Sequence, residues 1–114
     1  MLLQDTNRPA EAEPLMGRAL AIDQASFGPD HPDVAIDLNN LGMLLQDTNR
    51  LAEAEPLMRR MAVIFLTFER STGHNHPDAD TGVRNYENLL SELGRDAPAI
   101  RAAIDDARRE AGLR

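Results

Sequence analysis

A long segment of this sequence occurs twice, and this repetition limits the folds that the chain can adopt. Residues 1–16 read MLLQDTNRPAEAEPLM and residues 43–58 read MLLQDTNRLAEAEPLM, so the two copies differ only at Pro9 against Leu51. A match of this length indicates duplication rather than chance. Repetition at a fixed period of about this size is typical of proteins in which one supersecondary unit stacks on its own copy.

A third, more diverged copy follows. Residues 27–45, FGPDHPDVAIDLNNLGMLL, align without a gap with residues 72–90, TGHNHPDADTGVRNYENLL. In this alignment, which has an offset of 45, Asn40 falls on Asn85 and the HPD triplet falls on a second HPD triplet. We therefore expect a single domain made of three units: a truncated repeat at 1–28, a full repeat at 29–73, and a degenerate last repeat with a capping helix at 74–114.

The spacing of apolar residues predicts two helices in each unit. In the second unit, apolar residues recur at helical spacing in Pro32–Thr48 and again in Leu51–Arg70, and the sequence DTNR separates the two segments. A last helix, Ala97–Ala111, has one apolar face and a charged back, as the end of a stacked array requires. The predicted fold class is therefore all-α.

The second unit resembles the tetratricopeptide repeat family. The two leading small positions of that repeat fall on Gly42 and Ala54, with the large apolar Leu41 and Leu45 around Gly42. The text HPDVAIDLNNLGMLLQDTNRLAEAEPLMRR is similar to the 42-residue variety found in kinesin light chains and in many bacterial scaffold proteins. The resemblance implies a right-handed α-solenoid of stacked antiparallel helix pairs, in which small residues let paired helices cross closely.

The resemblance covers essentially the whole chain and is strongest over residues 1–64. In the third unit, Glu87 stands where Gly42 stood, and Asp106 stands where the earlier units have Ala19 and Met61. Ala99 still matches Ala54. We therefore expect the two helices of the second pair to cross closely. The substitutions in the third unit argue against an equally close crossing in the third pair.

The HPD triplets allow a second interpretation, because a triplet of this kind also occurs in the loop of J-domain co-chaperones. Two copies, each before an amphipathic segment, favour a helix start with Asp30 or Asn75 as the N-cap. The sequence HNHPD also places two histidines close to an aspartate. A structural zinc site, however, requires four ligands, usually including Cys, and this segment offers only three. We expect no metal and no other cofactor.

Paired carboxylates raise the question of catalysis. Glu53 and Glu55 recur in the first unit as Glu11 and Glu13, whereas a catalytic pair needs an asymmetric pocket that separates two pKa values. The sequence has no nucleophile elbow, phosphate-binding loop or glycine-rich fingerprint. We therefore expect a protein that is not an enzyme.

Composition narrows the range of partners. Acidic residues outnumber basic ones by 19 to 12, which gives a net charge of -7. This balance argues against nucleic acid and against an anionic membrane surface, both of which attract Lys and Arg. Every basic residue is Arg, which suggests a bacterial coding sequence. The start of the chain lacks the pattern of a signal peptide, and we expect a cytoplasmic protein.

The resemblance implies that the first helix of each unit lines a concave groove that binds a protein or peptide. Asn40 and Asn85 match the family position whose amide often bonds a partner's main chain. The alternative is that these amides brace neighbouring helices. The candidate groove residues are Asn39, Asn40, Met43, Gln46, Asp47, Arg84, Asn85, Asn88, Ser91 and Glu92.

A second functional hypothesis is a structural or assembly module that self-associates or docks another domain. Met1 aligns with Met43, in the middle of a first helix, so we expect the chain to be the C-terminal part of a longer array. Apolar residues near this end would then be open to a second copy and could form a homodimer. The candidates are Leu2, Leu3, Leu15, Met16 and Leu20.

Overall fold

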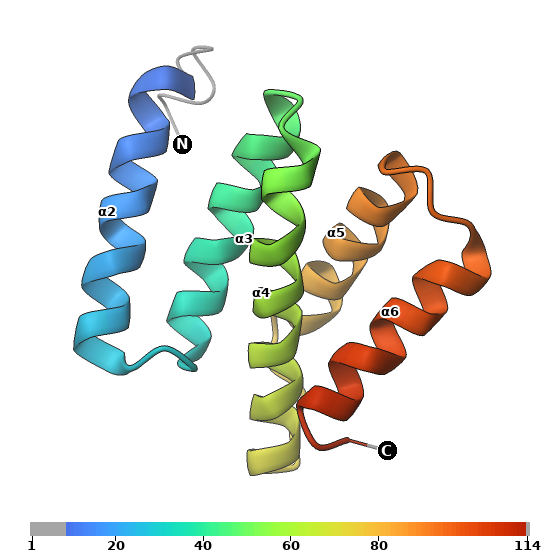
Figure 1. The fold of residues 1–114 in the computed structure, drawn as a ribbon. Coiled ribbons are helices and arrows are strands. Elements are labelled where there is room, and N and C mark those ends of the chain that lie inside the picture. The colour runs from blue at the N-terminus through green and yellow to red at the C-terminus, as the bar shows by residue number, and fades with distance from the viewer. Residues whose placement is uncertain (1–8, 114) are drawn as a thin grey trace.

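The computed structural model describes residues 9–113, so the predictions that concern Leu2 and Leu3 lie outside the described residues. Within this range the chain forms five helices in antiparallel succession (Figure 1). They are α2 (Pro9–Phe27), α3 (Pro32–Asp47), α4 (Leu51–Thr72), α5 (Ala79–Glu92) and α6 (Ala97–Glu110). The described residues contain no strand, and the predicted α-solenoid of stacked helix pairs is confirmed.

The two turns inside the helix pairs are built alike. Asn49, after α3, has a φ of 62°, and Gly94, which falls on it by the offset of 45, has a φ of 88°. The next N–H reaches back to the preceding helix in both turns, from Arg50 to the Leu45 carbonyl at 2.7 Å and from Arg95 to the Leu90 carbonyl at 3.0 Å. Asn and Gly are the residues that adopt this left-handed conformation most readily. The shared geometry supports the alignment of the third unit.

The helix starts at the HPD triplets differ from the prediction. The N-cap of α3 is His31 rather than Asp30, because the imidazole Nδ1 of His31 accepts the N–H of Asp33 at 3.0 Å. His76 Nδ1 accepts the N–H of Asp78 at 3.1 Å in the same way, although α5 begins only at Ala79 and its N-cap is Asp78 rather than Asn75. The histidine ring thus takes the acceptor role that carboxylates and hydroxyls usually have at helix starts.

The close crossing of α3 and α4 is confirmed. Gly42 is buried, and a Cβ at this position would lie 2.5 Å from Met58 Sδ. Ala54, the other predicted small position, is fully buried. In the third pair, by contrast, Ala99 is exposed and Glu87 is only half-buried. The tight crossing in the third repeat unit instead joins α5 to α4, where a Cβ on Gly82 would lie 2.7 Å from Met61 Sδ.

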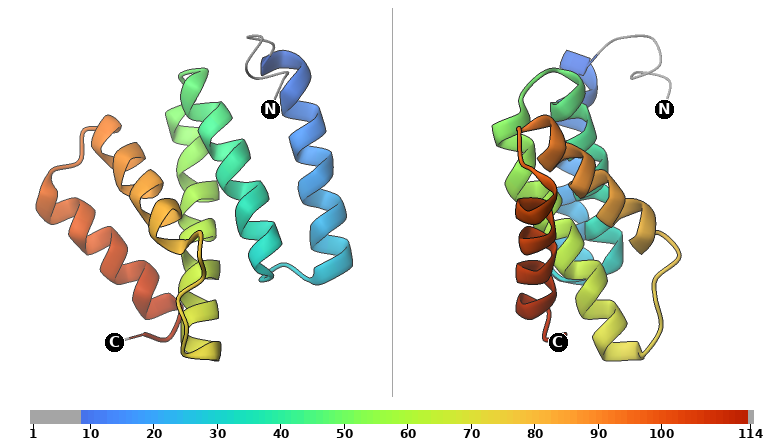
Figure 2. Two further views of the ribbon diagram at one scale, coloured as in Figure 1. Left: turned by 180° about the vertical axis from the view of Figure 1, so that it is seen from behind. Right: turned by 90° about the vertical axis from the view of Figure 1, so that its right-hand side faces the viewer.

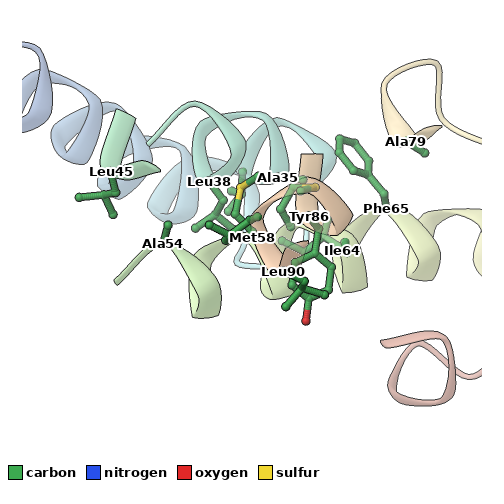
Figure 3. Close-up of a cluster of buried hydrophobic side chains, with 14 residues drawn as sticks. Ala35, Leu38, Leu45, Ala54, Met58, Ile64, Phe65, Ala79, Tyr86 and Leu90 are labelled. Atoms are coloured by element: carbon green, nitrogen blue, oxygen red, sulfur yellow. The ribbon is translucent and has the colours of Figure 1, made fainter. Parts of the chain in front are cut away.

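The hydrophobic core is centred on α4, which packs against α3, α5 and α6. Figure 3 shows part of this cluster, with Met58, Ile64 and Phe65 of α4 meeting Leu38 of α3 and Tyr86 of α5. The sequence of α4 is apolar almost all round, which fits a helix that is covered on more than one side. A smaller cluster of Leu66, Ala107 and Ala111 lies between α4 and α6.

The helices form two layers. In the edge-on view of Figure 2, α3 and α5 lie on one side and α4 and α6 on the other. An ion pair from Arg59 to Glu110 at 2.6 Å joins α4 to α6, and one from Arg95 to Glu55 at 3.4 Å joins the loop before α6 to α4. All the predicted groove residues come from α3 and α5, and we assign all but Arg84 to the face that these two helices share.

Candidate partner-binding groove

Polar side chains join α3 to α5 along this face. Asn85 Nδ2 donates to Asn39 Oδ1 at 3.1 Å, and Gln46 Nε2 donates to Glu92 Oε2 at 2.5 Å. Met43 Sδ lies between the two amides, 3.5 Å from Asn39 Nδ2 and 3.7 Å from Asn85 Nδ2. Several predicted groove residues are therefore engaged with one another across the two helices.

A cleft of about 220 Å³ opens beside these bridges, between α3, α5 and the α4 helix beneath them. Phe65 of α4 forms part of the floor of the cleft but is only 1% exposed, and Gly82 packs closely on its ring, since a Cβ there would lie 3.1 Å from it. The cleft is lined by Ile36, Asn39, Asn40, Phe65, Asp78, Thr81 and Gly82.

The two asparagines matched to the family position have different surroundings. Asn85 is half-buried and bonded to Asn39, which corresponds to the bracing role. Asn40 is exposed and lies at the rim of the cleft. An exposed amide offers both a donor and an acceptor to a main chain that runs past it. Asn85 therefore braces α3 against α5, whereas the role of Asn40 in partner binding stays a prediction.

The remaining predicted residues separate into two groups. Asp47, Asn88 and Ser91 are exposed further along the same two helices. Arg84 lies elsewhere, because it lines a second cleft between α5 and α6 together with Glu69 and Arg108. The structure does not bring Arg84 to the cleft between α3 and α5.

Sequence reasoning missed Ile36, Phe65 and Thr81, which form much of the cleft. It searched for polar residues on the first helices and assigned apolar ones to the core. Ile36 lies one helical turn before Asn40, so the spacing carried a usable signal. Phe65 comes from a second helix of the repeat, and its position in the groove could not be read from spacing along α3 or α5.

The groove face is acidic. Helix α3 contains three Asp and no Arg. Asp78 lines the cleft just before α5, with its side chain 60% exposed, and Asp33 lies in the first turn of α3, with its side chain 50% exposed. Glu92 and Asp47 add carboxylates at the other ends of these helices. Such a face carries a negative potential that attracts cationic groups.

An unusual carboxyl pair lies at the junction of α2 and α3. Burial and a hydrogen bond to the Asp23 carboxyl raise the pKa of Asp37 from 3.8 to about 7, with smaller charge repulsion from Asp23 and Asp33. Its Oδ2 is buried and has no hydrogen-bond partner among the described residues. At the next junction the equivalent residues, by offsets of 42 and 45, are Phe65 and Gly82.

The carboxylates considered for catalysis serve as ion-pair partners. Arg50 binds Glu13 at 2.6 Å and Glu53 at 2.7 Å, and its hydrogen bond lowers the pKa of Glu53. Glu55 pairs with Arg95. In residues 9–113 no group of three or more potential ligands is placed to hold a metal ion. No helix in the same range is long and apolar enough to cross a membrane.

Stacked antiparallel helix pairs with small residues at their crossings define a helical repeat protein. The sequence profile of the tetratricopeptide repeat family matches residues 1–61, and the chain belongs to this family. No curated protein gives a significant match to the chain. Tetratricopeptide repeats generally mediate interactions between proteins and are typically non-catalytic.

Proposed function

We propose that this chain is a non-catalytic scaffold that binds a protein segment in the groove between α3 and α5. The observation that carries the proposal is the exposed Asn40 amide at the rim of the cleft between α3 and α5. This arrangement offers polar bonds to a partner's main chain, with Ile36 beside them as an apolar contact. The 42-residue spacing of the first two copies supports a repeat of the kinesin-light-chain type.

Selection of a displayed random peptide library against the immobilised chain tests this proposal. We expect the selected peptides to perturb backbone amide resonances along α3 and α5 in NMR titrations, most strongly around Asn40 and Thr81. Perturbations confined to the outer face of α6 or to α2 would contradict groove binding.

The two asparagines provide a second test. We expect Asn40→Ala to weaken binding of the selected peptides while the melting temperature stays nearly unchanged, because its amide is exposed. Asn85→Ala removes the bond to Asn39 and should lower the free energy of unfolding by about 0.5–1.5 kcal/mol. Titration calorimetry and urea unfolding measure the two effects. A large stability loss in Asn40→Ala would assign that amide to bracing and remove it from the groove.

A second candidate function is self-association through α2, and a specific observation supports it. Leu15 and Ile22 are 43% and 56% exposed, and with exposed Ala19 they follow the i, i+4, i+7 spacing of one helix face. Contiguous apolar surface of this kind often marks an interaction site. Leu20 packs against the core cluster and Met16 is half-buried, so the proposed surface is centred on Leu15 and Ile22.

Sedimentation at increasing protein concentration tests self-association. We expect the chain to form a dimer, and Ile22→Arg to shift it to the monomer. The neighbouring Ala21→Arg is the control, because Ala21 is exposed but lies off the stripe. A monomer at all concentrations, or equal effects of the two variants, would contradict an interface on this face.

A further inference from the structure

Helix α4 is an internal template for the exposed face of α2, because the two helices hold equivalent positions in the repeat. By the offset of 42, Met61 and Ile64 of α4 correspond to Ala19 and Ile22 of α2. Met61 and Ile64 are 0% and 2% exposed, whereas Ala19 is exposed and Ile22 is 56% exposed. The same helix face is therefore covered on α4 and open on α2.

Two helices cover α4. Gly42 of α3 lies against Met58, where a Cβ would be 2.5 Å from the sulfur, and Gly82 of α5 lies against Met61, where it would be 2.7 Å away. By the offset of 45, α3 is the equivalent of α5, so α3 takes on α2 the place that α5 takes on α4. Within residues 9–113, α3 is the helix that packs closely on α2. None of the described helices thus takes on α2 the place that α3 takes on α4.

The residues by which α3 covers α4 indicate what a covering helix must offer. Gly42 is the position of closest approach, and Leu38 and Leu45 lie one helical turn before and after it. Both leucines are buried in the core cluster, with 0% and 4% of their surface exposed. A helix face with a small residue between two leucines therefore fits a surface of this kind.

A polar contact accompanies this packing. Arg60 of α4 donates to the Pro29 carbonyl at 3.1 Å and to Gln24 Oε1 at 2.6 Å, so it holds the chain that leads into α3. Arg18 is the α2 counterpart of Arg60, and it is exposed one helical turn before Ile22. A covering helix with a backbone carbonyl just before its first turn would offer Arg18 the same acceptor.

From these equivalences we infer that the exposed face of α2 binds an amphipathic helix of the α3 type from a partner protein, with a small residue between two leucines on the contact face and a backbone carbonyl opposite Arg18. The inference deepens the second candidate function and rests on it, because both require the stripe of Leu15 and Ile22 to be an interaction surface. A partner helix of this type would displace a second copy of the chain from that stripe.

A synthetic peptide with the sequence of residues 29–47 is the probe, because this segment contains Pro29 and the whole of α3. We expect the peptide to bind the whole chain saturably and to perturb the backbone amide resonances of α2 around Ala19 and Ile22. A peptide that carries Gly42→Leu should bind at least tenfold more weakly, because the added side chain prevents the close approach. Titration calorimetry measures both affinities.

Substitutions in the chain locate the contact. Ile22→Arg should weaken binding of the unsubstituted peptide at least tenfold, because it places a charge in the apolar contact. Arg18→Ala should weaken binding about fivefold, because it removes the donor to the peptide carbonyl. Ala21→Arg, at an exposed position off the stripe, is the matched control and should leave the affinity unchanged. Circular dichroism establishes that each variant is folded.

Each alternative result has a definite meaning. The absence of peptide binding, equal binding of the Gly42→Leu peptide, or equal effects of Ile22→Arg and Ala21→Arg would each overturn the inference. If the chain dimerises in sedimentation but does not bind the peptide, this inference fails while self-association stands. If the chain is monomeric at all concentrations but binds the peptide at α2, self-association fails while this inference stands.

Discussion

Truncation of Phe65 to alanine is expected to lower the free energy of unfolding by about 3–5 kcal/mol. The Phe65 side chain is 1% exposed and belongs to the central core cluster. Its ring centroid lies 5.0 Å from that of His76, and its edge would be 3.1 Å from a Cβ on Gly82. No neighbouring element can close the resulting void easily, because Phe65 joins α4 to both the loop before α5 and α5 itself. Urea unfolding followed by circular dichroism measures the loss.

Phe27→Ala is the matched control. Phe27 is 51% exposed and stacks on His31 with a centroid distance of 4.7 Å, so its removal leaves no interior cavity. We expect a loss of about 1 kcal/mol or less for this variant. Similar losses in the two variants would mean that Phe65 is not a core residue, and the packing of α5 on α4 would have to be revised. The large effect is a sizeable share of the roughly 5–15 kcal/mol that stabilise a typical domain.

The sequence was sufficient to predict features that depend on local pattern or on duplication. The break at DTNR, the extents of α3 and α4 to within two residues, and the close crossing of Gly42 with α4 all follow from apolar spacing and small residues in the repeated text. The offset of 45, when it is continued past residue 90, also places Asn49 on Gly94, and the two share a left-handed conformation. Such features are determined within one unit, which is why a single sequence reveals them.

Features that depend on how units meet were not predicted. The cleft combines Ile36, Phe65 and Thr81, which come from three helices, so its existence depends on the angle between units. The cap by His31 depends on the orientation of an imidazole ring, which composition does not specify. Asp37 resembles an ordinary solvent-facing residue of an amphipathic helix. Only its alignment with Gly82, a buried position, hints that it lies at a junction between units.

The Asp37 junction leads to the second large effect, which is a dependence of stability on pH. The pKa of Asp37 is raised to about 7 in the folded chain, because the carboxyl is partly buried and donates to Asp23. In the unfolded chain it returns to about 3.8. Between these values the folded state holds a proton that the unfolded state has lost. The contribution of Asp37 to stability is therefore fully present below pH 3.8 and is lost as the pH rises through about 7.

Asp37→Asn is expected to remove this dependence. Asparagine keeps the shape of the protonated acid and still donates to Asp23, so at pH 8 the variant should be more stable than the parent chain by about 1–2 kcal/mol. This figure is well below the ~4 kcal/mol that three pKa units represent, because Asp37 is partly exposed and solvent screens the repulsion.

Below about pH 3.8 the parent and the Asp37→Asn variant should unfold at nearly the same urea concentration, because Asp37 is then protonated in both the folded and the unfolded chain. The charged groups that act on Asp37 are Asp23 from α2 and Asp33 from its own helix. Asp30→Asn is the control, since Asp30 is exposed and is not among these groups. It should leave the difference between pH 5 and pH 8 unchanged. An Asp37→Asn variant that is less stable than the parent at pH 8 would show that Asp37 is ionised there without strain. The junction between α2 and α3 would then be held by a charged aspartate rather than by a shared proton.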